Sequence, residues 1–174
     1  DSAGTVSGTL SGSAHFVAGG VSGGAISIAQ ATNDFVSMGD VFQFDGNDSF
    51  SIQVWVKTAP GQQGAMFPIS SHLTTIAHGY LISINEGAGY GRPNNAYFYT
   101  GDFPAQEAIS TSTVNDGQWH QIVGVYSPSS GPVIYVDGAP REATGSQGYF
   151  SPGDAPFMVG GLRIYPGVLQ GYYT

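Results

Sequence analysis

Aromatic and polar residues of the kind that bind sugars lie together between positions 90 and 103. Tyr97 and Tyr99 fall on one face of an expected strand and Phe98 on the other, because side chains alternate along a strand. Aromatic rings offer flat apolar faces, and flanking amides and acids supply hydrogen bonds in ligand pockets. The segment therefore predicts a carbohydrate-binding site, whose candidate residues are Tyr90, Arg92, Asn94, Asn95, Tyr97, Tyr99 and Asp102. The alternative is that Phe98 is core and the tyrosines are ordinary half-buried strand residues.

A second group of polar residues consists of acids around two expected turns. Calcium takes oxygen ligands from carboxylates, amides and backbone carbonyls. The acids predict a structural calcium site, with Asp34, Asp40, Asp45 and Asp48 as candidate ligands. Residues 45–48 also suit a plain turn, and they do not form an EF-hand loop.

The residues that catalysis would need do not form a recognisable pattern. Retaining glycosidases place two carboxylates about 5 Å apart, but Glu86, Glu107 and Glu142 each stand alone in the sequence. The four histidines are scattered, and the sequence has no nucleophile elbow, zinc-protease motif or phosphate loop. We therefore expect a protein that is not an enzyme.

The charge of the chain limits its partners. Four Lys and Arg stand against 12 Asp and Glu, which gives a formal net charge of −8. Nucleic acids and anionic membrane surfaces both require clustered cations, so neither is an expected partner. No apolar run is long enough to insert into a membrane, and the absence of cysteine excludes disulfides and thiol chemistry. Glycans, cationic partners and calcium remain compatible with this surface.

The pattern of apolar residues indicates an all-β fold. Residues 49–57 alternate so regularly that Phe50, Ile52, Val54 and Val56 should face a core. Trp55 falls on the opposite face, and we interpret it, like Trp119, as a packing anchor. Further short strands are expected at residues 26–28, 35–36, 64–70, 80–85, 96–100, 119–126, 133–136 and 156–159. Their spacing predicts a two-sheet antiparallel jelly-roll sandwich, with residues 1–174 forming a single domain.

Two motifs resemble a known family. The phrase N-D-G-Q-W-H at residues 115–120, followed by strands at 121–126 and 133–138, is similar to the core hairpin of laminin-G-like jelly rolls. These domains belong to the concanavalin-A-like lectin/glucanase superfamily. Residues 23–28 and 33–40 resemble the opening of the same fold. The resemblance implies a secreted or extracellular recognition module, most often for carbohydrate, that in many cases holds calcium.

The chain departs from this family at its end. Relatives usually close with a strand of the type F-x-G-x-I-D-E-V-R-I, which residues 163–165 match only in part. We therefore expect an unpaired edge beside the 119–136 hairpin, filled by downstream sequence or by the leader of another copy, around residues 6–16. The alternative function is a structural subunit of a surface layer, filament or adhesin completed by strand exchange. The start at Asp1 without Met suggests a processed protein or an excised fragment.

Overall fold

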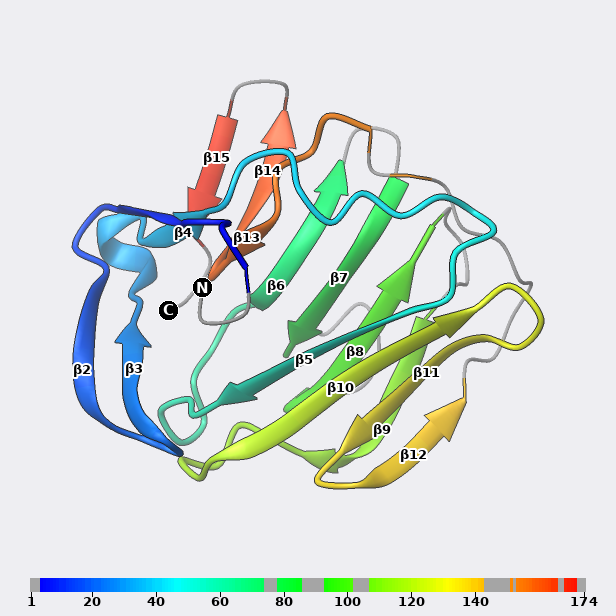
Figure 1. The fold of residues 1–174 in the computed structure, drawn as a ribbon. Helices are drawn as coiled ribbons and strands as arrows, with labels where there is room; N and C mark the ends of the chain where they lie inside the picture. The colour runs from blue at the N-terminus through cyan, green and yellow to red at the C-terminus, as the bar shows by residue number, and fades with distance from the viewer. Residues whose placement is uncertain are drawn as a thin grey trace.

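The chain forms two facing antiparallel sheets and a separate two-stranded ribbon (Figure 1). A computed structural model describes residues 4–73, 78–85, 93–101, 107–142, 151, 153–165 and 168–171. The larger sheet has the order β1-β4-β13-β6-β7-β8-β9, and a hairpin of β14 and β15 joins it at β6. Its strands are β1 (Thr9–Ser11), β4 (Phe35–Ser37), β6 (Met66–Leu73), β7 (His78–Ile84), β8 (Asn95–Thr100), β9 (Glu107–Thr113), β13 (Met158–Val159), β14 (Gly161–Tyr165) and β15 (Val168–Gly171).

The smaller sheet has the order β12-β11-β10-β5. Its strands are β5 (Phe50–Val56), β10 (His120–Ser127), β11 (Gly131–Val136) and β12 (Ala139–Glu142). The ribbon consists of β2 (His15–Gly20) and β3 (Gly23–Ser27), and a short 3-10 helix, η1 (Gln30–Thr32), follows it. The predicted jelly-roll sandwich is confirmed, and the ribbon is an addition that the sequence did not reveal.

The core lies between the two sheets and follows the alternation read from the sequence. Phe50, Ile52 and Val56 of β5 are buried and Val54 packs against the same cluster. Across the interface, Phe98 of β8 is fully buried and faces Gly124 of β10. A side-chain carbon at position 124 would lie 2.5 Å from the Phe98 ring, so this glycine allows the two sheets to approach.

The strand edges differ from what the sequence predicts. The 119–136 hairpin has a neighbour on each side, because β10 pairs with β5 and β11 pairs with β12. The leader pairs within its own chain, β1 with β4 and β2 with β3, so in this structure it is not a free donor strand. In the larger sheet, β13 fills the position between β4 and β6. Among the described strands, this sheet therefore ends one strand further out than expected on each side, at β5 and at β12.

Candidate functional site

The predicted tyrosine pair lies on the outer face of the larger sheet, away from the core between the sheets. Tyr97 is only 1% exposed and Tyr99 is half-buried. Tyr99 packs against a small apolar cluster of Phe67, Leu81 and Leu162. A ring as buried as Tyr97 presents no face to a sugar in this conformation, so within the pair only Tyr99 is placed to stack.

A buried histidine holds the Tyr99 ring in place. The ring centroids of His72 and Tyr99 lie 5.2 Å apart at an interplanar angle of 79°, an edge-to-face contact. Neither ring nitrogen of His72 has a hydrogen-bond partner among the described residues. Burial, with the nearby His78 adding to its effect, lowers the pKa of His72 to about 4. The ring is therefore neutral at physiological pH and acts as an apolar neighbour of Tyr99.

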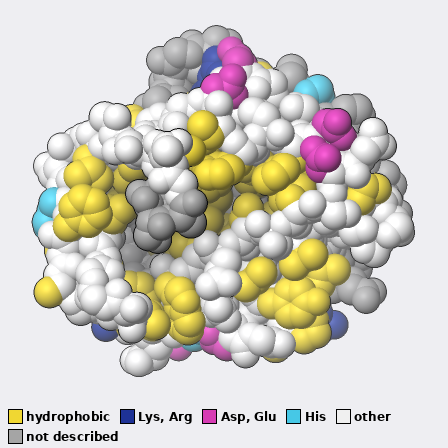
Figure 2. All heavy atoms as spheres, viewed as in Figure 1, with side chains coloured by type: hydrophobic (Ala, Val, Ile, Leu, Met, Phe, Trp, Pro, Cys, Tyr) yellow, Lys and Arg dark blue, Asp and Glu magenta, His cyan; other side chains and the backbone are white. Residues whose placement is uncertain are grey.

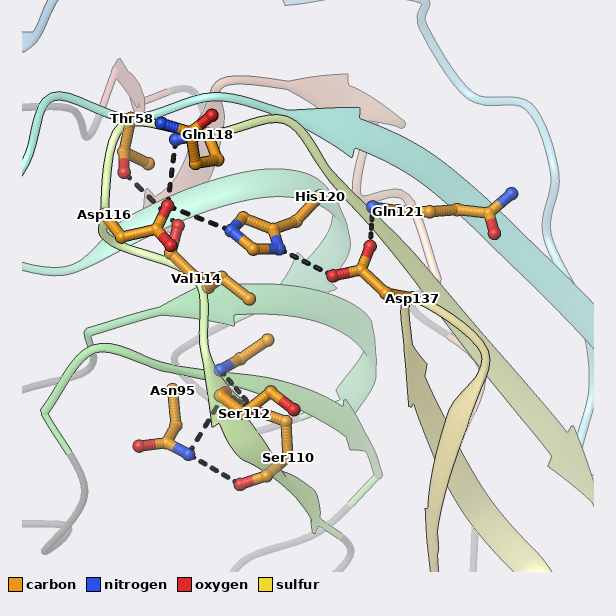
Figure 3. A network of polar contacts seen from close by, with 11 residues as sticks. Thr58, Asn95, Ser110, Ser112, Val114, Asp116, Gln118, His120, Gln121 and Asp137 are labelled. Carbon is orange, nitrogen blue, oxygen red and sulfur yellow. Dashed lines mark hydrogen bonds and ion pairs between the residues drawn. The ribbon is translucent and has the colours of Figure 1, made fainter.

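The side chains of the two predicted amides in the described part of the chain make hydrogen bonds within the protein instead of facing a common cavity. Asn95 donates to the carbonyls of Ser110 and Ser112, at 2.6 and 3.3 Å (Figure 3). Asn94 accepts at its side-chain oxygen from Asn115, at 3.0 Å. Three further candidates, Tyr90, Arg92 and Asp102, lie outside the described residues.

The candidates of the described part are also spread along β8. Asn95 begins that strand and Thr100 ends it, and five steps of an antiparallel strand span about 17 Å. A ligand that reached both ends of β8 would have to be longer than one sugar ring.

The four candidate calcium ligands do not come together. Asp34 is buried, and its carboxylate accepts from the backbone N–H of Ser13, at 2.5 Å, and of Ala29, at 3.0 Å. Burial acts to raise its pKa, but hydrogen bonds from Thr32, Ser13 and Ala29 lower the pKa below its usual value. These contacts make Asp34 an anchor between the ribbon and β4.

The other acids are exposed, and two of them share one turn. Asp45 accepts from the N–H of Asn47 at 2.7 Å, and Asp48 accepts from the N–H of Asp45 at 2.8 Å. Asp40 lies apart on an exposed loop. Within the described ranges, no group of three or more histidine, aspartate or glutamate side chains is arranged to hold a metal ion. Calcium binding stays a prediction.

The hairpin motif contains a polar network that sequence reasoning missed. His120 lies between two carboxylates, with Nδ1 2.7 Å from Asp137 and Nε2 3.0 Å from Asp116 (Figure 3). Partial burial acts to lower the pKa of His120, but the hydrogen bonds and charges of Asp137 and Asp116 raise the pKa above its ordinary value. Asp137 also accepts from the backbone N–H of Gln121 at 2.9 Å, so the network joins β10 to the turn after β11.

Asn115, the first residue of the same motif, holds the turn that follows β5. Its side-chain oxygen accepts from the Thr58 hydroxyl at 3.0 Å and from the Gln62 N–H at 3.2 Å, and its amide donates to the Gln62 carbonyl at 2.7 Å. Gly117 has a φ of +85°, and a side chain there would contact Pro60 at 2.8 Å. The motif therefore shapes the turn at residues 58–62.

That turn closes one end of a groove of about 570 Å³ between the ribbon and the smaller sheet. One wall is β3 and the residue after it, from Gly24 to Ile28, and the other is β5 and its continuation, from Val54 to Ala59. Pro68 and Val159 of the larger sheet line the bottom. Figure 2 shows hydrophobic side chains gathered over the ribbon and around the hollow beside it.

Both tryptophans of the chain line this groove, and Trp55 is 42% exposed. The interpretation of Trp55 as a packing anchor is therefore wrong, since a large part of its surface is accessible. Its position opposite Ile52 in the alternating pattern was the one signal in the sequence. We call this feature, bounded by residues 24–28 and 54–59, the edge groove.

Comparison with known proteins agrees with the fold. The sequence matches a family model described as the concanavalin A-like lectin/glucanases superfamily over residues 30–171. No curated protein matches the chain. The structure is similar to the crystal structure of the binding domain of Paraclostridial Mosquitocidal Protein 1, with a TM-score of 0.68 at 13% identity over 95% of this chain and 40% of that one.

A second similar structure is the botulinum neurotoxin serotype G binding domain, with a TM-score of 0.60 at 15% identity, over 90% of this chain and 39% of that one. The chain thus spans about two fifths of the length of both domains, and at these identities the likeness shows the fold. Among the described residues, no helix has the length and apolar character needed to cross a bilayer. The chain belongs to the concanavalin A-like lectin/glucanases superfamily, in agreement with its hairpin motif.

Proposed function

We propose that the chain is a non-catalytic recognition module that binds carbohydrate at an extracellular surface. Its superfamily includes lectins by name, and both similar structures are titled binding domains of other proteins. A fold hosts many functions, so the ligand class must be argued from a site.

The observation that carries the carbohydrate proposal is the position of Tyr99. Its ring is partly exposed on the outer face of the larger sheet and is held by the edge-to-face contact with His72. A fixed aromatic ring loses little conformational entropy when a sugar stacks on it. In the sequence, Asp102 follows Tyr99 by three residues, and we propose it as a hydrogen-bonding partner for sugar hydroxyls.

A glycan array followed by affinity measurement tests this proposal. Tyr99→Ala should weaken the binding of any retained glycan by about fivefold, because one aromatic contact contributes about 1 kcal/mol. The matched control is Tyr135→Ala, the same change at a half-buried tyrosine of the smaller sheet. Equal binding by wild type and Tyr99→Ala would remove Tyr99 from the site, and a wild type that retains no glycan would refute the carbohydrate proposal.

We also propose a structural calcium ion, with ligands from among Asp34, Asp40, Asp45 and Asp48. Asp45 and Asp48 share one turn, which supports them as a pair. Asp34 is the weakest of these candidates, because backbone N–H groups already use its oxygens.

The alternative function, a structural subunit completed by strand exchange, is favoured by the open edge of β5. A structural subunit of this kind should show a molecular mass in solution that increases with protein concentration. A concentration-independent monomer with glycan affinity would support recognition instead.

A further inference from the structure

The backbone of β5 presents unused hydrogen-bonding groups toward the edge groove. Gln121 of β10 directs both its N–H and its C=O to Asp137, each at 2.9 Å, and therefore away from β5. Trp55 lies opposite Gln121 in the β5–β10 register. In an antiparallel pair of strands, two opposed residues either exchange both of their backbone hydrogen bonds or both direct these groups outward. Because Gln121 directs its groups outward, the backbone groups of Trp55 also face away from β10. Two residues earlier, Gln53 has the same orientation.

No strand of the described chain pairs with this side of β5, which ends its sheet. Long, regular strand edges are usually covered or protected by charge or proline. The outward-facing side chains of β5 here are Ser51, Gln53 and Trp55, and none of them is charged. The edge therefore has the backbone chemistry to bind another strand.

The opposite wall of the edge groove is a second unpaired edge. β3 pairs with β2 on one side, and no other described strand pairs with it. The walls are lined by consecutive residues, Gly24 to Ile28 and Val54 to Ala59. Neighbouring side chains in a strand point to opposite faces, so a groove over one face would be lined by every second residue. This groove is lined by consecutive residues, and it therefore runs along the edges of the strands. The five residues of the first wall extend for about 16 Å and the six of the second for about 20 Å.

We propose that the edge groove binds an extended strand of a partner polypeptide, which pairs with β3 and β5 together and joins the ribbon to the smaller sheet. This is recognition by strand addition, in which main-chain hydrogen bonds give affinity and alternate side chains give specificity. The inference uses a different surface from the carbohydrate proposal and does not depend on it.

The residues that line the groove indicate which side chains the partner strand should carry. Side chains that point inward would rest on Pro68 and Val159, so alternate residues should be apolar. Lys57 is the charged residue that lines the groove. A carboxylate near Lys57 therefore suits the partner strand, and a cationic residue there does not.

A separate polypeptide fits better than a second copy of this chain. Each described strand already pairs in one of the three sheets, so a second copy would have to break a pairing of its own to donate one. Two copies would also bring net charges of −8 together. A partner segment that is extended and unpaired carries neither cost.

A synthetic peptide tests the proposal with the intact chain. The probe is seven residues of alternating valine and threonine with one terminal aspartate, capped at both ends and free of aromatic residues. Both tryptophans line the groove, so binding should change the tryptophan fluorescence saturably. A peptide of the same composition with its valines consecutive is the control and should bind at least tenfold more weakly. Absence of a saturable change at millimolar alternating peptide overturns the proposal.

Backbone methylation distinguishes a strand between two edges from a strand on one edge. One probe is N-methylated at its odd residues and another at its even residues, and each set removes the donors from one side of the strand. Insertion between β3 and β5 predicts that each set weakens binding at least tenfold. Loss with only one set would show pairing to a single edge and contradict the two-edged groove.

Two variants at one position test the role of the β5 edge. Trp55→Ala removes the side chain, and Trp55→Pro also removes the N–H that faces the groove. Both leave the β10 ladder intact, because proline is tolerated where its nitrogen points away from the neighbouring strand. Trp55→Pro should bind the probe at least tenfold more weakly than Trp55→Ala, with similar thermal unfolding. Equal binding of the probe by Trp55→Ala and Trp55→Pro would refute the contact with the β5 edge. If the wild-type protein forms dimers and the probe dissociates them, the occupant of the groove is a second copy of the chain and not a separate polypeptide.

Discussion

Replacing Tyr97 by alanine should destabilise the fold, whereas the same change at Tyr99 should cost much less. The two residues share one face of β8 but differ in burial, since Tyr97 is 1% exposed and Tyr99 is half-buried. If both tyrosines form a stacking platform, as the sequence predicts, replacing both by alanine is expected to leave thermal unfolding nearly unchanged. The structure reverses that expectation for Tyr97.

The size of the effect follows from burial. Truncating a fully buried aromatic residue to alanine costs about 3–5 kcal/mol, because the transfer free energy is lost and a cavity remains. For a chain of this length, 1 kcal/mol corresponds to about 2–4 °C in melting temperature. Tyr97→Ala should therefore lower the midpoint by roughly 10 °C. Tyr99 keeps part of its ring exposed, so Tyr99→Ala removes less buried surface and should lower the midpoint by less than Tyr97→Ala does.

Thermal melts and urea unfolding of the two single variants measure the difference, with Tyr97→Phe as the control that keeps the ring. Tyr97→Phe should stay within about 1–2 kcal/mol of wild type, since only the hydroxyl is lost. Near-equal midpoints for Tyr97→Ala and Tyr99→Ala would refute the assignment of Tyr97 to the interior. Glycan binding measured on the same variants separates a lost fold from a lost contact.

Three other predictions concern the core, the hairpin motif and the ion. Gly124→Ala should lower the free energy of unfolding by about 1–3 kcal/mol, because the new side chain overpacks against Phe98. Adding Phe98→Leu should recover part of that loss in a double-mutant cycle, and additive losses would contradict the contact. Because the pKa of His120 is raised by Asp137 and Asp116, its ion pairs stabilise the fold below the ordinary pKa of 6.5, and this stability is lost as the pH rises through the folded value. The stability gap between wild type and His120→Gln should therefore be larger at pH 5.5 than at pH 8.5, and a gap that grows with pH would be the wrong sign. A bound calcium ion should raise the melting temperature by mass action, and chelator should lower it; unchanged melts in both would exclude a stabilising site.

The strands of the core were predictable because the alternation of apolar and polar residues that defines them can be recognised within a short stretch of sequence. The alternation of Phe50, Ile52 and Val56 against exposed neighbours requires one buried face, and the register of β5 with β10 confirms it. Turn residues with positive φ, such as Gly117 and Asp137, mark where the hairpin motif bends. These patterns, together with the resemblance of the motif, predicted the sandwich.

The sites were not predictable from the same patterns. Tyr97 and Tyr99 occupy equivalent positions of one strand, and what covers each of them depends on segments distant in sequence. The edge groove arises because β3 pairs with β2 and not with β5, and no local motif shows that β3 and β5 will lie on either side of a groove. His120, Asp116 and Asp137 likewise meet only because a turn after β11 folds back against β10.

Hydrogen exchange at individual backbone amides of β5 tests the central claim most directly, which is that this strand offers an open edge to a partner. The register predicts that the amides of Ile52 and Val54, which face β10, exchange slowly. The amides of Gln53 and Trp55 should exchange fast in the free protein and become protected when the alternating peptide is added. Protection of Gln53 and Trp55 in the free protein, or fast exchange that the peptide leaves unchanged, would contradict the account.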